Sequence, residues 1–102
     1  MAVIIMSTFS PQSGNKERVA NLLEAVDIAF AQQAGYVLGL RYAGMNDSDE
    51  IGRIFVWESI EAGRDAEASK EASPLLRRIR NLSEESVMNN VYSLEGYALK
   101  PN

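Results

Sequence analysis

The order in which hydrophobic periodicity changes along the chain constrains its fold more than any other feature. Short segments with strand-like composition alternate with longer segments in which apolar residues recur every three or four positions, as they do in helices. In chain order we predict a strand over 2–9, a helix over 16–33, strands over 36–43 and 52–59, a helical region over 59–82 and a strand over 87–99. The order β-α-β-β-α-β is that of the ferredoxin-like arrangement. We therefore predict an α+β fold in which one antiparallel sheet carries its helices on one face.

The clearest strand is the stretch Gly52-Arg53-Ile54-Phe55-Val56-Trp57-Glu58-Ser59. It is too short for most helices and rich in β-branched and aromatic residues, a composition typical of a strand in the middle of a sheet. It leads to the only tryptophan, Trp57, and then to Ser59, which can cap the N-terminus of a helix. A polar loop joins it to the 36–43 strand, so the two strands are predicted to form a hairpin.

The predicted strands carry apolar residues on both faces. In the first strand Val3, Ile5, Ser7 and Phe9 share one face, whereas Ile4, Met6 and Thr8 share the other. In the 36–43 strand, Tyr36, Leu38, Leu40 and Tyr42 are predicted to face one way. Helices would cover only one side of the sheet, and the second side needs other cover. Contact between the sheets of two copies would provide it, so we predict a homodimer.

Two absences narrow the possible chemistry. The 102 residues include no cysteine and no histidine, which excludes thiolate nucleophiles, Ser-His-Asp triads and metal or haem sites built from these ligands. Ten basic and fourteen acidic side chains give a net charge of −4, which argues against a nucleic-acid partner. No apolar run approaches the about 20 residues of a membrane span, and residues 1–6 lack the basic region of a signal peptide. We expect a single cytoplasmic domain over 1–102, without a membrane partner.

The loop before the central strand has a partial calcium-binding pattern. Asp47, Asp49, Gly52 and Glu58 match the first, third, sixth and twelfth positions of an EF-hand loop. The fifth position is Ile51, which cannot bind a metal, and the segment from Arg53 onward is strand-like rather than helical. We therefore expect a solvated hairpin tip and no metal.

Four short motifs give the chain a resemblance to the antibiotic biosynthesis monooxygenase-like proteins. They are Ser13-Gly14-Asn15-Lys16-Glu17, Ala34-Gly35-Tyr36, Phe55-Val56-Trp57-Glu58-Ser59 and Ala72-Ser73-Pro74-Leu75-Leu76. Their order and spacing are similar to those of the family, and the resemblance covers nearly the whole chain. It implies a dimeric α+β barrel with one pocket per subunit, between the sheet and the helices. In some members it implies oxidation of polycyclic phenols by O₂ without a cofactor, and in a related branch the degradation of haem.

The resemblance also implies positions for site residues. Trp57 matches the pocket tryptophan of the family. Ser7 lies where the haem-degrading branch carries an asparagine, and Leu76 lies near the position of a histidine in many members. These two departures argue against haem degradation, and we expect the protein to use no cofactor.

We expect Trp57, Arg53 and Ser7 to carry the chemistry: Trp57 would position an aromatic ring, Arg53 would stabilise a phenolate, and Ser7 would hydrogen-bond the ligand. The alternatives are a core tryptophan, an arginine that reaches water at the sheet end, and a serine bonded to backbone or water. The substrate-binding residues are predicted to be Phe9, Phe55, Leu76 and Tyr92. Of Asn89 and Asn90, adjacent on the last strand, at least one must face each side of the sheet, so one can enter the pocket.

The leading hypothesis is a dimeric, cofactor-independent monooxygenase that oxidises a phenol or hydroquinone. The alternatives are a non-catalytic dimer that binds a small apolar molecule, and an isomerase of small lactones on the same fold. The polar groups of the pocket discriminate between them. An apolar pocket would favour simple binding, whereas an isomerase would need a pair of carboxylates or amides.

Overall fold

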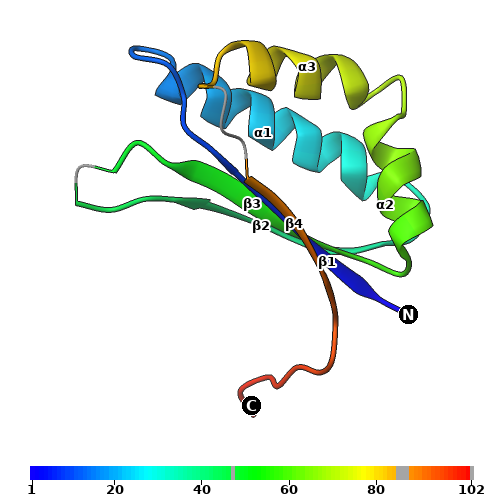
Figure 1. The fold of residues 1–102 in the computed structure, drawn as a ribbon. Coiled ribbons are helices and arrows are strands. Elements are labelled where there is room, and N and C mark those ends of the chain that lie inside the picture. Colours follow the sequence, from blue (N-terminus) through cyan, green and yellow to red (C-terminus); the bar gives the residue numbers. More distant parts are fainter. Residues whose placement is uncertain (47, 85–87, 102) are drawn as a thin grey trace.

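The computed structural model describes residues 1–46, 48–84 and 88–101. Its elements are β1 (Val3–Phe9), α1 (Lys16–Ala31), β2 (Tyr36–Ala43), β3 (Ile51–Trp57), α2 (Ile60–Glu67), α3 (Ser73–Asn81) and β4 (Met88–Ser93). The strands form one antiparallel sheet in the order β2-β3-β1-β4, and the helices all lie on one face of it (Figure 1). The predicted α+β ferredoxin-like fold is confirmed, with its second helical region divided into α2 and α3.

The strand β3 lies inside the sheet, between β1 and β2, as its apolar character predicts. Because β1 and β3 pair without irregularity, their odd-numbered residues all point toward the helices. The buried apolar residues on this side are Val3, Ile5, Phe9, Ile51, Phe55 and Trp57. The predicted apolar stripe of α1 is buried against them, with Val19, Leu22, Leu23, Val26 and Phe30 as its members. The core therefore lies between the sheet and the helices.

The strand β2 contains a bulge near its start. Tyr36 pairs with Trp57, but the next pair is Leu38 with Val56, so Val37 is an extra residue in the strand. Tyr36 consequently points toward the helices, where its ring centre lies 5.4 Å from that of Trp57. Leu38 and the alternate residues after it point away. The prediction that Tyr36 shares the face of Leu38 is wrong because the bulge shifts the alternation by one position.

The helix α2 begins where Ser59 predicts. The backbone N–H of Ala62 donates a hydrogen bond of 3.1 Å to the Ser59 hydroxyl, which satisfies one of the free donors of the first turn. One turn into the helix, a Cβ atom on Gly63 would lie 2.8 Å from Cδ1 of Ile5. The glycine therefore lets α2 approach the sheet closely.

The dipeptide Ser73-Pro74 predicts that Ser73 is the N-cap of α3 and Pro74 its first residue, but the helix begins one residue earlier. Ser73 is its first helical residue, and Ala72 occupies the N-cap position without a side-chain cap. The assignment of Ser73 as the N-cap is therefore wrong. The Ser69 hydroxyl instead accepts a hydrogen bond of 3.2 Å from the backbone N–H of Ala72, and this bond stabilises the turn before α3. Pro74 lies in the first turn of the helix, where its missing N–H leaves no bond unmade.

The two serines make a matched pair for measuring the cap. We expect Ser59→Ala to lower the free energy of unfolding by about 1 kcal/mol, because the N–H of Ala62 loses its partner. Ser73→Ala, the same chemical change at a helix start without a side-chain cap, is expected to change it by less than about 0.5 kcal/mol. Urea titration followed by circular dichroism measures both values, and equal losses would contradict the assigned caps.

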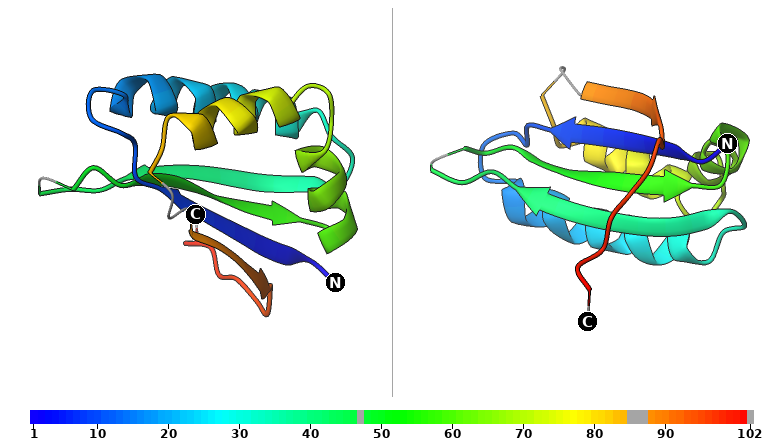
Figure 2. Two further views of the ribbon diagram at one scale, coloured as in Figure 1. Left: turned by 45° about the horizontal axis from the view of Figure 1, so that its top comes forward. Right: turned by 90° about the horizontal axis from the view of Figure 1, so that it is seen from below.

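The strand β4 is shorter than predicted, since it ends at Ser93 rather than Leu99. The N–H of Leu94 donates a bond of 3.0 Å to the carbonyl of Ala2, and β1 itself begins at Val3, so the pairing stops there. Residues 94–101 then cross the helix-free face of the sheet (Figure 2). The first residue of the predicted strand, 87, lies outside the described residues, as does residue 47 of the acidic loop.

We call the helix-free side of the sheet the open face. Its apolar residues are Ile4, Met6, Leu38, Leu40, Ile54, Val56 and Tyr92. Leu38, Leu40 and Tyr92 are 50%, 54% and 51% exposed, so residues 94–101 cover this face incompletely. A hollow of about 430 Å³ remains between residues 94–101 and the sheet. Within the described residues, no helix combines the length and apolar character that a membrane span requires.

Candidate functional site

A cavity of about 230 Å³ lies between the sheet and the helices α2 and α3. It is lined by Ser7, Phe9, Arg53, Glu67, Leu76, Arg80 and Asn89. These residues come from β1, β3, α2, α3 and β4, so folding brings them together from the whole length of the chain. Among the described residues, Arg53 is the one charged side chain that is buried, and we call this hollow the Arg53 cavity.

Three polar residues lie side by side across the sheet at this cavity. The register of β1 pairs Ser7 with Arg53 on one side and with Asn89 on the other. The Ser7 hydroxyl donates a hydrogen bond of 2.8 Å to Oδ1 of Asn89, so this serine is bonded to a side chain. The bond uses the amide oxygen and leaves the NH₂ donors of Asn89 for another partner. Of the two adjacent amides, Asn89 therefore faces the cavity, and Asn90 faces the other way.

The guanidinium of Arg53 packs against two aromatic rings. The side chain is only 2% exposed, and Cζ lies 4.0 Å from the ring centre of Phe55 and 4.5 Å from that of Phe30. Its Nε and Nη1 atoms are buried and have no hydrogen-bond partner within the described residues. The alternative of an arginine that reaches water is therefore wrong, and Arg53 is instead a buried cation at the cavity wall.

The burial of the Arg53 charge costs folding free energy. Burial lowers the pKa of Arg53 to about 9, although the carboxylates of Asp27 and Glu67 act to raise it, so the group stays protonated at neutral pH. Burying an ion costs several kcal/mol, whereas contact with an aromatic face returns on the order of 2 kcal/mol per ring. No carboxylate in the described residues lies within ion-pair distance of Arg53. Because Arg53 forms part of the cavity wall, an anion bound in the cavity would offset this cost through its charge.

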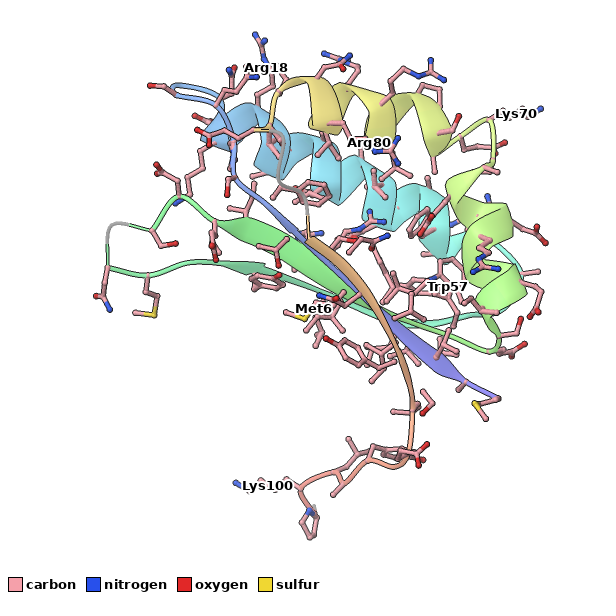
Figure 3. The ribbon with its side chains drawn as sticks, viewed as in Figure 1. Met6, Arg18, Trp57, Lys70, Arg80 and Lys100 are labelled. Carbon is pink, nitrogen blue, oxygen red and sulfur yellow. The ribbon has the colours of Figure 1, made fainter. Side chains whose placement is uncertain are left out.

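Trp57 does not line the Arg53 cavity. Its side chain is 1% exposed and lies edge-on to Phe30 and Tyr36, with ring centres 5.2 Å and 5.4 Å away. Figure 3 shows it between the sheet and the helices. These contacts favour the core alternative for Trp57 over direct contact with a ligand. Phe55 is likewise buried and does not line the cavity, in contrast to its predicted role in substrate binding. It contacts the guanidinium of Arg53 instead.

Tyr92 lies on the opposite side of the sheet from the cavity. It pairs with Ile4 and belongs to the open face, where it is half exposed. Asn89 faces the helices, and the alternation of β4 turns Tyr92, three positions later, away from them. The prediction that Tyr92 lines the pocket between the sheet and the helices is therefore wrong.

The structure brings together Ser7, Arg53, Phe9 and Leu76, which the sequence analysis placed in the site. The sequence analysis missed two charged lining residues, Glu67 and Arg80. Each lies one helical turn after a residue that faces the sheet: Glu67 after Gly63 in α2, and Arg80 after Leu76 in α3. Figure 3 shows Arg80 directed from α3 toward the sheet. The four-residue spacing from Leu76 is the signal that could have identified Arg80.

Comparison with solved structures confirms the fold resemblance. SnoaB, a cofactor-independent oxygenase from Streptomyces nogalater, superposes in a single-residue variant with a TM-score of 0.82 at 21% identity, over 97% of this chain and 98% of that one. Rv0793 from Mycobacterium tuberculosis gives 0.86 at 17% identity, over 97% and 100%. A candidate antibiotic biosynthesis monooxygenase from Nitrosomonas europaea gives 0.84 at 6% identity, over 92% and 90%. The sequence itself matches no family profile and no curated protein. The chain thus has the fold of antibiotic biosynthesis monooxygenase-like proteins.

Proposed function

We propose that residues 1–102 form one functional domain, a homodimeric monooxygenase that oxidises a small phenol or hydroquinone with O₂ and no cofactor. The observation that carries the proposal is the buried cation Arg53, which has no ion-pair partner among the described residues, at the wall of a cavity beside the hydrogen-bonded pair Ser7 and Asn89. The fold shared with SnoaB, which is a cofactor-independent oxygenase, supports the reaction class.

The proposed reaction uses the substrate as its own reductant. A hydroquinone loses a proton, and the electron-rich anion transfers one electron to O₂. The two radicals combine into a ring peroxide anion, which takes back the proton lost in the first step, and the resulting hydroperoxide eliminates water. One oxygen atom stays on the ring, the other leaves in water, and the hydroquinone becomes a hydroxyquinone after giving up four electrons. The protein has to stabilise the anion, orient the ring and exclude bulk water.

The lining residues fit these tasks. Arg53 stabilises the phenolate, and the NH₂ group of Asn89, oriented by Ser7, donates to a second ring oxygen. Phe9 and Leu76 provide the apolar surface for the ring. Glu67 is the carboxylate of the lining and takes the proton from the phenol.

The same lining favours oxidation over the two alternatives. A site for a purely apolar ligand would not keep a buried guanidinium among its walls. For a lactone isomerase we sought a pair of carboxylates or a pair of amides, but the lining contains one of each, Glu67 and Asn89.

An oxygen electrode tests the proposed reaction. With a panel of single-ring hydroquinones, we expect O₂ uptake above the rate of autoxidation in buffer. Glu67→Gln should lower the rate at least about 10-fold by removing the base, while Arg77→Met, on the outer side of α3, should retain it. With ¹⁸O₂, one labelled atom should enter each product molecule. Uptake at the buffer rate, or product without label, would contradict the proposal.

The open face supports the dimer. Its apolar residues extend over all four strands, and the positions on this face of β1, β2 and β3 include no charged residue. A second copy would present the same apolar strand residues, so a two-fold contact between open faces is self-complementary. Such a contact would also cover Tyr97 and Leu99, which are 83% and 82% exposed in the single chain.

A charge on the open face should separate the subunits. We expect Leu40→Glu to raise the dimer dissociation constant at least about 100-fold, because each copy would bury an unpaired carboxylate. Ile28→Glu makes the same change on the outer side of α1, where the side chain is 64% exposed, and should leave the dimer intact. Light scattering during size-exclusion chromatography measures the mass. A wild-type protein with the mass of one chain would contradict the dimer.

A further inference from the structure

We propose that the Arg53 cavity binds a single-ring aromatic acid, with the carboxylate against Arg53 and the ring between Phe9 and Leu76. This inference rests on the proposed function, which makes the cavity the substrate site. It adds the charge and size of the substrate, and it assigns Arg53 to the carboxylate and leaves the phenolate oxygen to the NH₂ group of Asn89. The substrate class is then a benzoate that carries hydroxyl groups, rather than a neutral or polycyclic phenol.

The unpaired nitrogen atoms of Arg53 argue for a ligand that carries a full negative charge. The guanidinium packs against Phe55 and Phe30, whose ring centres are 4.7 Å apart and therefore adjoin each other rather than enclose it, and Arg53 forms part of the cavity wall. Nε and Nη1 have no partner within the described residues, although most buried polar groups in proteins are paired. A carboxylate is planar and acceptor-only, and matches the edge of a guanidinium better than any neutral group does.

The charges around the cavity favour entry of an anion. Arg80 is a second cation of the lining, and Glu67 is its one carboxylate. The chain as a whole carries a net charge of −4, so the positive charge at the cavity is opposite in sign to the net charge of the protein. A local concentration of positive charge at a cavity raises the local concentration of anions.

The volume of the cavity limits the ligand to one ring. A cavity of about 150 Å³ is enough to hold benzene in another protein, whereas sites for drug-sized ligands have about 300–1,000 Å³. The Arg53 cavity, at about 230 Å³, therefore fits a benzene ring with small substituents. Asn89 lines the same cavity from the sheet, and its NH₂ donors are placed to bind a ring hydroxyl.

Binding measured without oxygen tests this inference separately from catalysis. The probe is a benzoate with two hydroxyl groups para to each other, and the matched neutral probe is the corresponding benzamide. By anaerobic isothermal titration calorimetry on the full chain, we expect the benzoate to bind about 10- to 100-fold more tightly, the range typical of a hydrogen bond to a charged group. Equal affinities of the wild-type protein for the two probes would overturn the inference without any variant.

Two variants locate the effect. Arg53→Met keeps a long side chain against the rings and should bind the benzoate and the benzamide with about equal affinity. Arg77→Met removes an arginine outside the cavity and should keep the full preference. A preference that survives in a folded Arg53→Met protein would overturn the inference. If that variant does not fold, Arg80→Met provides the second measurement, with an expected loss of about 2- to 5-fold in benzoate affinity alone; an unchanged affinity there would count against the inference.

The outcomes for binding and for catalysis are distinguishable. If the benzoate binds through Arg53 but no O₂ is consumed, the anion site stands and the oxygenase proposal fails. If neutral hydroquinones bind as well as the acid and are oxidised, the oxygenase proposal stands and the anion inference fails.

Discussion

Replacement of Trp57 by alanine is expected to lower the free energy of unfolding by about 3–5 kcal/mol, the range for a large aromatic residue removed from a packed core. The side chain is 1% exposed and is enclosed by Phe30, Phe55 and Tyr36. Gly63 of α2 closes the remaining side, because a Cβ atom there would lie 3.1 Å from Cδ1 of the indole. These neighbours belong to four different elements, so they cannot collapse easily into the space that the indole leaves.

The matched control is Tyr97→Ala, because Tyr97 is a large aromatic residue that is 83% exposed. In the monomeric Leu40→Glu background, where no partner covers it, this change should alter the free energy of unfolding by less than about 0.5 kcal/mol. Urea denaturation measures both variants. It is monitored by far-ultraviolet circular dichroism, a signal that does not need the tryptophan as a probe. Since a domain of this size is stabilised by about 5–15 kcal/mol, Trp57→Ala should leave little stability in reserve. A loss below about 1 kcal/mol would contradict the core role of Trp57.

Substitution of Gly52 by alanine is expected to cost about 3 kcal/mol, at the upper end for overpacking by one methyl group. Tyr42 of β2 extends over Gly52 to Thr8 of β1, and the two hydroxyl groups form a hydrogen bond across the glycine. A Cβ atom on Gly52 would lie 2.5 Å from Cζ of Tyr42 and would also collide with the backbone carbonyl of Ser7. The carbonyl belongs to the neighbouring strand and cannot move without disturbing the pairing of β1 with β3.

Gly96→Ala is the control for this change, because a Cβ atom on Gly96 would meet nothing within 4 Å. It should leave stability unchanged or raise it slightly, since alanine restricts the unfolded chain more than glycine does. The midpoint of thermal unfolding compares the two variants in one experiment. Equal midpoints would mean that the space over Gly52 adapts, and would contradict the rigid three-strand contact.

The sequence was most informative where local periodicity decides the structure. Alternation along β3 predicts that Arg53, Phe55 and Trp57 share one face, and they do, because this strand pairs with β1 without a bulge. The stripe of α1 and the cap at Ser59 follow equally from spacing and side-chain type. Each of these features depends on only a few consecutive residues.

The features that the sequence did not reveal depend on partners far along the chain. The bulge that turns Tyr36 toward the helices arises from its pairing with β3, and β4 ends at Ser93 because β1 offers nothing further to pair with. The position of the cavity depends on how α2 and α3 pack over the sheet. For this reason Trp57 is a residue of the packed interior, while the neighbouring hollow is formed around Arg53, four positions earlier.

The buried arginine packed against two phenyl rings has a consequence for laboratory evolution. A population selected only for heat resistance should replace it with a straight apolar side chain, which fills the same space without the need to strip water from a charge. Selection for turnover of an acid should restore it. The two pressures act in opposite directions on a single codon. Alternating them would show directly whether this position gains heat resistance only by losing turnover.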